Sequence, residues 1–352
     1  MIRIPWWRTD LGREEADRLG QAVFDRTINQ GRLCRELEER IAQRLGANHV
    51  ITCASGSAAL ALALLACGVK PGDEVIVPAA TFIATAHAVL LVGGRVCLVD
   101  VLPDRPLIDP AAVAAAITPR TRAIIAVHLN GGGCDIGALK RFGLPVIEDS
   151  AQAFCSRGTE SWLGTSGAAG TFSMSIAKLL TTGEGGFLVT GDDATAVAAR
   201  RLRNQGVDLI GDNVFNRFGF NFRLTDLQAA VGLVQLDRLD DKIGAVTEVY
   251  RFYREALPGL SLIPVDLQGG EVPLWTQAMS GDRDRLQVSL AARGIQLRPF
   301  NPCLADCEHL RTPGDFGNAR RFAAQGFTLP SGPNQPRADL EEVVTALNEV
   351  MG

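Results

Sequence analysis

Short apolar segments alternate with helical segments from about residue 48 to residue 205, and this alternation most constrains the fold. Several of the apolar segments are unbroken, as in Ala-Ile-Ile-Ala-Val at 123–127, which is typical of strands buried on both faces. Helical patterns at 58–66 and 192–203 lie between them. The pattern predicts an α/β domain around a largely parallel sheet. The expected strands are 50–54, 74–78, 95–101, 122–129, 145–149, 170–175 and 186–190.

The chain changes character after Arg223. Thr225 and Gln228 have the spacing of a capping box and are expected to open a helical region that reaches about residue 257. Proline and glycine become denser after Pro258, and a final amphipathic helix is expected at 338–351. Because 352 residues exceed one compact core, we expect a large domain at 1–245, with an N-terminal helical segment, and a smaller C-terminal α+β domain at 246–352.

Composition excludes several classes of protein. The chain is 47% hydrophobic and 21% charged with a formal net charge of -4, which fits a soluble globular protein and argues against nucleic-acid binding. Apolar runs such as 58–67 are too short to span a membrane. Residues 1–8 lack the apolar centre of a signal peptide. We therefore expect a cytoplasmic protein that binds no nucleic acid and no membrane.

One lysine, Lys178, lies between two apolar stretches and just before a Thr-Thr-Gly-Glu-Gly-Gly loop at 181–186. A partly desolvated lysine has a lowered pKa and can attack a carbonyl as a free amine. The segment alone equally fits a surface lysine beside a glycine turn.

Two further features point to a ligand site. Asp149 falls at the carboxyl end of an expected strand, where the ligand crevices of open α/β sheets form, although it could equally cap the next helix. Ser55, Gly56 and Ser57 stand where a strand gives way to an alanine-rich helix, and a helix start of small residues can hold a phosphate. Serine also caps many helices that bind nothing.

Together, a lysine amine, a strand-end aspartate and a phosphate seat are what pyridoxal phosphate (PLP) requires. The lysine would form a Schiff base with the cofactor, the aspartate would keep the pyridine nitrogen protonated, and the helix start would hold the phosphate. The sequence therefore predicts a PLP enzyme.

Seven motifs, in order and spacing, carry a resemblance to a known family. They are Ser-Gly-Ser-Ala-Ala-Leu at 55–60, Pro-Gly-Asp-Glu-Val-Ile-Val-Pro at 71–78, Thr-Phe-Ile-Ala-Thr-Ala at 81–86, Glu-Asp-Ser-Ala-Gln-Ala at 148–153, the segment from Phe-Ser at 172–173 to Lys178, the loop at 181–186 and Gly-Phe-Asn-Phe-Arg at 219–223. The chain resembles the DegT/DnrJ/EryC1/StrS family of sugar aminotransferases from about residue 10 onward. This resemblance implies the aspartate-aminotransferase-like fold (PLP fold type I).

The resemblance also implies residue roles. Lys178 matches the catalytic Schiff-base lysine, Asp149 the partner of the pyridine nitrogen, and Gln152 the residue near the ring hydroxyl. Phe82 matches the aromatic residue that stacks on the ring, with a core phenylalanine as the alternative. Asn221 matches an asparagine that reaches the neighbouring subunit's cofactor, which implies a homodimer with shared active sites. The phosphate-holding positions match Gly56, Ser57, Ala58 and Ser173.

The substrate follows less directly. Arg298-Pro299-Phe300 is similar to a segment of the perosamine-synthase-like branch, which aminates C4 of a nucleotide-linked 4-keto-6-deoxyhexose. Arg298, Phe300, Glu184 and Arg223 are the expected substrate contacts, and glutamate is the expected amino donor. The product would enter a surface polysaccharide or an antibiotic sugar. The chain departs from the family at Ala305, where a histidine is usual, and at 273–277 (Pro-Leu-Trp-Thr-Gln).

Other interpretations remain open at this point. Lys178 favours transamination over the family's dehydratases, which carry histidine there, but amination at C3 or of a keto-cyclitol is an alternative. A non-catalytic PLP-binding dimer is another. An NAD-dependent oxidoreductase would need a Gly-x-Gly-x-x-Gly spacing, which the glycines at 131–137 lack. Cys303, Cys307 and His309 resemble part of a zinc site without a second ligand pair, so no metal is expected.

Overall fold

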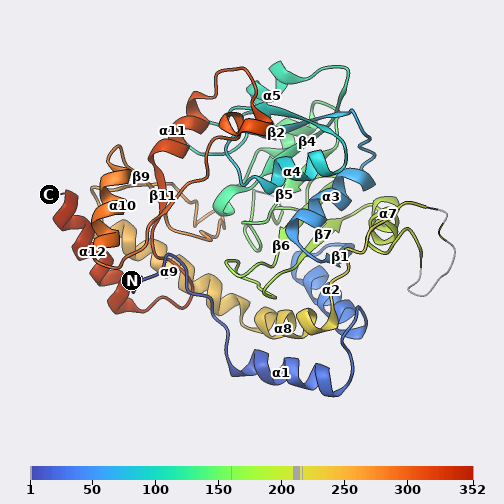
Figure 1. Cartoon of the computed structure of the whole chain (residues 1–352), viewed down its shortest axis with the longest axis horizontal. Coiled ribbons are helices and arrows are strands. Elements are labelled where there is room, and N and C mark those ends of the chain that lie inside the picture. Colours follow the sequence, from blue (N-terminus) through green and yellow to red (C-terminus); the bar gives the residue numbers. More distant parts are fainter. Residues whose placement is uncertain (1, 160, 209–214, 216, 352) are drawn as a thin grey trace.

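The computed structural model describes residues 2–159, 161–208, 215 and 217–351, and a seven-stranded sheet forms its centre (Figure 1). The strand order is β1-β7-β6-β5-β4-β2-β3. Strand β7 runs antiparallel to β1 and β6, and the other neighbouring pairs are parallel. The strands are β1 (His49–Cys53), β2 (Glu74–Pro78), β3 (Arg95–Val99), β4 (Thr121–Val127), β5 (Val146–Asp149), β6 (Ala169–Ser173) and β7 (Gly186–Thr190).

All seven expected strands are confirmed, with ends that shift by a few residues. Strands β5 and β7 are buried along their whole length, because helices or other chain segments cover both faces of the sheet. Strands β1, β5 and β6 run in the same direction, so their carboxyl ends meet at one edge. That edge brings together segments that are more than a hundred residues apart in the sequence.

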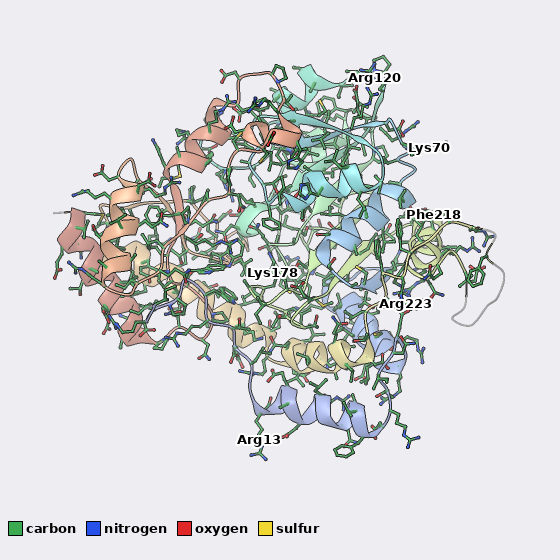
Figure 2. The ribbon with its side chains drawn as sticks, viewed as in Figure 1. Arg13, Lys70, Arg120, Lys178, Phe218 and Arg223 are labelled. Carbon is green, nitrogen blue, oxygen red and sulfur yellow. The ribbon has the colours of Figure 1, made fainter. Side chains whose placement is uncertain are left out.

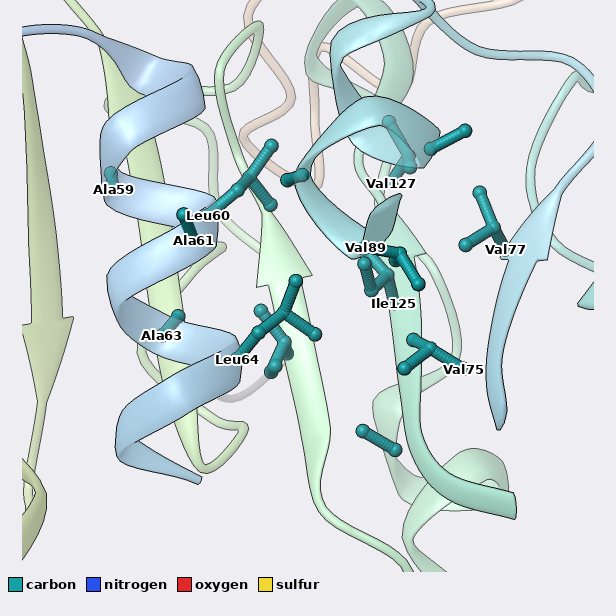
Figure 3. Packing of buried hydrophobic residues seen from close by; sticks show 14 of the residues in the cluster. Ala59, Leu60, Ala61, Ala63, Leu64, Val75, Val77, Val89, Ile125 and Val127 are labelled. Carbon is teal, nitrogen blue, oxygen red and sulfur yellow. The ribbon is translucent and has the colours of Figure 1, made fainter. Parts of the chain in front are cut away.

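Helix α3 (Gly56–Ala66) directly follows β1 and packs against the sheet. It is apolar on nearly every side and almost wholly buried, as expected for a helix in the centre of a domain. Figure 3 shows Leu60 and Leu64 of α3 directed toward the sheet, in which β4 carries Ile125 and Val127. This packing fixes the start of α3 at the carboxyl edge of the sheet.

The remaining helices of the larger part lie around the sheet and below it in Figure 1. Thr225 caps α8 as predicted, because its main-chain N–H donates to Gln228 Oε1 at 3.1 Å and its hydroxyl accepts from the Gln228 N–H at 3.3 Å. The expected helical region to residue 257 is two helices, which meet at Arg238. These helices are α1 (Arg13–Phe24), α2 (Arg32–Leu45), α4 (Ala84–Leu91), α5 (Pro110–Ala116), α6 (Ile136–Lys140), α7 (Asp193–Arg203), α8 (Asp226–Asp237) and α9 (Leu239–Ala256).

A second, four-stranded antiparallel sheet of order β10-β11-β9-β8 forms in the C-terminal part. Its core includes Tyr253, Leu290 and Phe327, and Ile4 from the N-terminal segment lies in the same cluster. The α+β character expected of this part is confirmed, whereas a boundary at 245/246, which falls inside α9, stays a prediction. Its elements are β8 (Ser261–Leu262), β9 (Gln277–Met279), β10 (Arg298–Pro299), β11 (Gly326–Thr328), α10 (Arg283–Ala292), α11 (Gly317–Gln325) and α12 (Arg337–Met351), with short 3-10 turns at Leu304–Asp306 and Glu308–Leu310.

The eight cysteines all lie in the described part of the chain, and each is a free thiol, four of them buried. Cys303 is one of the buried ones, and His309 faces His87, with 2.8 Å between the two Nε2 atoms. No cluster of three or more potential metal ligands occurs among the described residues. Within those residues, no helix combines the length and the apolar character that crossing a membrane requires.

Candidate active site

A cavity of about 320 Å³ opens at the carboxyl edge of the central sheet, between that sheet and the C-terminal part. We call the side formed by Gly56, Ser57, Asp149, Gln152, Ser173 and Lys178 the sheet wall. We call the side formed by Trp275, Gln277, Arg298 and Phe300 the C-terminal wall. The structure brings ten of the thirteen expected site residues to this cavity, namely Gly56, Ser57, Phe82, Asp149, Gln152, Ser173, Lys178, Glu184, Arg298 and Phe300.

Lys178 is half-buried and lies in a turn after β6, where its N–H donates to the Ser175 carbonyl at 3.1 Å. Its Nζ atom is 5.1 Å from the centroid of the Trp275 ring. Burial lowers the pKa of Lys178 from 10.5 to about 8, an effect that Arg298 strengthens and Asp149 opposes. A large fraction of this amine is therefore neutral near pH 8, as a nucleophile or a proton acceptor requires.

Asp149 ends β5 and is only 4% exposed. Its carboxylate accepts hydrogen bonds from Thr85 Oγ1 at 2.8 Å and from the Ala151 N–H at 3.2 Å. Burial raises the pKa of Asp149, and Thr85, Ala151 and Lys178 each pull it down. Thr85 belongs to the family motif at 81–86, but no role for it was predicted from the sequence. The spacing of Thr81 and Thr85, whose hydroxyls lie 3.0 Å apart, was the available signal.

The start of α3 approaches the end of β6 closely. A Cβ atom on Gly56 would lie 3.0 Å from the Ser173 Cβ, so glycine permits this approach. The Ser55 hydroxyl accepts from the Ala58 N–H at 3.1 Å, so this amide is already paired, and Ala58 is buried outside the cavity lining. The N–H groups of Gly56 and Ser57, in the first helical turn, have no acceptor within the helix.

Gln152 is tied to the opposite wall through Asn130. Gln152 Oε1 accepts from the Asn130 N–H at 2.9 Å. Asn130 Oδ1 accepts from the Trp275 N–H at 2.7 Å, and Asn130 Nδ2 donates to the Trp275 carbonyl at 2.8 Å. No role for Asn130 or Trp275 was predicted from the sequence, in which the departure of 273–277 from the family pattern was the available signal.

The C-terminal wall carries polar groups that have no partner among the described residues. The Trp275 indole N–H and Gln277 Oε1 are buried without a hydrogen bond. Arg298 is half-buried, and its guanidinium lies 4.4 Å from the centroid of the Trp6 ring. Burial is the one cause that lowers the pKa of Arg298 below its ordinary value, and no carboxylate among the described residues offsets it. A guanidinium in that setting is suited to bind a carboxylate or phosphate.

Two other expected residues lie away from this cavity. Asn221 is exposed and pairs with Asn204, and Arg223 Nη1 donates to Asn204 Oδ1 at 2.7 Å. Figure 2 shows Lys178 near the middle of the molecule and Arg223 toward the side that carries α7. The roles expected of Asn221 and Arg223 stay predictions. Phe82 lines the cavity and is 48% exposed, which excludes the alternative of an ordinary core residue.

A strand-end aspartate, a desolvated lysine and a helix start around one cavity on a mostly parallel sheet define a protein of the aspartate-aminotransferase-like fold. Comparisons with known proteins agree with this class. The chain is 39% identical over 340 residues to GDP-perosamine synthase of Caulobacter vibrioides (strain ATCC 19089 / CIP 103742 / CB 15), covering 91% of each protein.

Solved structures give the same result. The structure of S. venezuelae DesV in complex with a ketimine intermediate is 33% identical, with a TM-score of 0.90 over 96% of this chain and 94% of that one. DesI in the presence of its TDP-sugar product is 30% identical, with a TM-score of 0.90 over 99% and 92% of the two chains. The model of the DegT/DnrJ/EryC1/StrS aminotransferase family matches residues 9–348. The chain belongs to this family, which confirms the resemblance, and it is a PLP-dependent aminotransferase.

Proposed function

We propose that this aminotransferase moves an amino group from glutamate to a keto sugar, and that the sugar is a nucleotide-linked 4-keto-6-deoxyhexose. The observation that carries the proposal is the cavity in which the Lys178 amine and the Asp149 carboxylate face one space. The names of the relatives support the sugar class, because one is a GDP-perosamine synthase and another was solved with its TDP-sugar product. Family products of this kind enter surface polysaccharides or antibiotic sugars.

The residues of the sheet wall fit PLP. Asp149 is a buried carboxylate with no positive hydrogen-bond partner, and a protonated ring nitrogen would favour its charged form. The free N–H groups at the start of α3, with Ser173 beside them, suit the phosphate. Phe82 would stack on one face of the ring and Gln152 would lie near its hydroxyl. When bound there, PLP supplies an electron sink for the carbon that exchanges the amino group.

Lys178 performs the proton transfers in this proposal. Its pKa of about 8 lets the amine accept a proton from the carbon of the donor that loses the amino group. In the second half-reaction the amine donates a proton to the carbon of the sugar that receives the amino group. Thr85 and the Ala151 N–H hold the Asp149 carboxylate in one orientation, in which it would keep the ring nitrogen of the cofactor protonated. The order of events is ping-pong, since the donor leaves as a 2-oxo acid before the sugar binds.

The C-terminal wall would contact the substrates. Arg298 would pair with the carboxylate of the donor or with a phosphate of the sugar nucleotide. Gln277 and the Trp275 indole offer hydrogen-bonding groups to hydroxyls of the sugar. Asn221 and Arg223, which lie outside the cavity of their own chain, would serve the site of a second copy in a homodimer. Glu184, at the rim after Lys178, completes the expected contacts.

The two half-reactions test the proposal separately. Purified enzyme loaded with PLP and given glutamate alone should release 2-oxoglutarate in an amount close to the enzyme concentration. A panel of keto-sugar nucleotides then identifies the acceptor by product mass. NAD(H)-dependent turnover without release of a 2-oxo acid would contradict the proposal.

A pair of lysine variants controls this experiment. Lys178→Ala should abolish the glutamate half-reaction, because no other lysine lines the described cavity. Lys140→Ala is the matched control, since Lys140 is exposed and donates only to the Ser166 carbonyl. Full activity in Lys178→Ala would show that the lysine is assigned wrongly.

A further inference from the structure

Asn130 links the two walls of the cavity without lining it. It lies in the 3-10 turn Leu129–Gly131 after β4 and is 4% exposed. Its side-chain amide closes two hydrogen bonds, of 2.7 and 2.8 Å, with the N–H and the carbonyl of Trp275. Two bonds to one residue fix both the position and the orientation of that residue's backbone.

The backbone of Asn130 is held in an uncommon conformation. Its φ is 52°, in the left-handed region that few residues other than glycine adopt. Asparagine enters this region more often than most residues do, and contacts around Asn130 hold it there. Here the contacts are the two bonds to Trp275 and the bond from the Asn130 N–H to Gln152 Oε1. An aspartate lacks the donor and a leucine lacks both groups, so the bridge needs an amide.

The residue that the bridge holds also lies over Lys178. The Trp275 ring is 5.1 Å from Lys178 Nζ, and the edge of Trp6 packs against Trp275 at 5.7 Å between ring centroids. An indole in that position excludes water from the amine, and its ring face also attracts a charged amine. The exclusion of water is the larger effect, because burial is the first cause of the lowered pKa of Lys178. The charged groups that face the amine are Asp149 from β5 and Arg298 from β10, and neither bonds to Asn130 in the described structure.

We propose that Asn130 is a positioning residue that holds the Trp275 indole over the Lys178 amine and thereby keeps water away from it. The inference rests on the role proposed above for Lys178. It assigns to a residue outside the cavity lining the task of keeping the amine available as a neutral base.

The test is the pH midpoint for deprotonation of Lys178 in the full-length, cofactor-free protein. The midpoint is followed by the rate at which an amine-acylating reagent modifies the Lys178 peptide, measured by mass spectrometry across a pH series. In Asn130→Gly the backbone keeps its positive φ and its bond to Gln152, and only the bridge to Trp275 is lost. Water then reaches the amine, and the midpoint should rise from about 8 by about one pH unit, a tenfold gain in proton affinity.

Two controls separate positioning from general loosening. Ser331→Ala removes the hydrogen bond of 3.0 Å to the N–H of Thr276, the residue after Trp275, and should leave the midpoint unchanged. Trp275→Ala should raise the midpoint by itself, and adding Asn130→Gly should raise it no further, because both changes act through one indole.

An unchanged midpoint in Asn130→Gly, or additive shifts in the double variant, would overturn the proposal. If Asn130→Gly does not fold, Asn130→Ser removes the same bridge and is expected to shift the midpoint in the same direction. The measurement needs no transamination, so its failure leaves the glutamate half-reaction as an independent test of the proposed function.

Discussion

The two walls of the cavity differ in how the buried polar groups of their side chains are paired. On the sheet wall, Asp149 accepts from Thr85 and Ala151, and Gln152 accepts from Asn130. On the C-terminal wall, the Trp275 indole N–H and Gln277 Oε1 are buried without a partner among the described residues. A buried polar group left unpaired costs about 1–3 kcal/mol, which a ligand that pairs with it would offset.

This difference separates two tasks. A wall whose groups are already held in place suits a ligand that never changes, which for an aminotransferase is the cofactor. A wall with unpaired groups suits ligands that enter and leave in each cycle, which are the donor and the sugar. Changes to the sheet wall should therefore reduce kcat, and changes to the C-terminal wall should raise KM.

The largest effect is expected from Asp149→Asn. The amide is nearly the same size but cannot stabilise a protonated ring nitrogen, so kcat should fall about 1,000-fold, equivalent to about 4 kcal/mol of transition-state stabilisation. Steady-state kinetics with glutamate as donor measure the loss. Asp135→Asn, at the cap of α6, is the matched control, and a loss below tenfold in Asp149→Asn would break the comparison.

Arg298→Gln should give the next largest effect, and this effect should fall on KM rather than on kcat. Loss of a guanidinium that binds an anion should raise KM by about 10- to 100-fold while kcat changes by only a few-fold. Initial rates over a range of donor and acceptor concentrations show which substrate Arg298 contacts. Arg293→Gln, whose side chain pairs with Glu349 on the surface, should change neither constant. A fall in kcat with KM unchanged would show that Arg298 acts as a residue of the sheet wall is expected to act, and would contradict the comparison.

A smaller effect is expected from Thr85→Val, which removes the hydrogen bond to Asp149. That bond favours the charged carboxylate, so its loss raises the pKa of Asp149 further above its ordinary value. The acid limb of the pH profile of kcat should move to higher pH, and activity should be lost first at low pH. Thr81→Val, which touches Thr85 and makes no hydrogen bond to Asp149, should move that limb less. A shift toward lower pH would contradict this account.

The two walls also differ in how well they could be predicted from the sequence. The seven strands and the start of α3 were predictable, because unbroken apolar runs and small residues at a helix start are local signals. So were Lys178 and Asp149, which stand at the ends of such elements. The break at Arg238 between α8 and α9 was not predicted, because no proline or glycine marks it.

Arg298 and Phe300 of the C-terminal wall were expected, whereas the contacts that hold this wall were far less predictable. Asn130 and Trp275 are 145 residues apart, and no local pattern shows that their backbones meet. The unpaired state of Gln277 depends on which segments pack around it, so it emerges only from the folded chain. Asn221 shows a further limit of the comparison between sequence and structure. A residue that would act in the site of a second subunit lies outside the cavity of its own chain, so the single chain does not test its role.

The most direct test of the two-wall account is to locate the cofactor chemically. PLP-loaded enzyme is treated with borohydride, which fixes a cofactor held by a lysine as a stable secondary amine, and the digested protein is analysed by mass spectrometry. The account predicts that the added mass falls on the peptide that contains Lys178 and that Arg298→Gln leaves this result unchanged. Label on another lysine, or loss of label in Arg298→Gln, would contradict the assignment of the cofactor to the sheet wall.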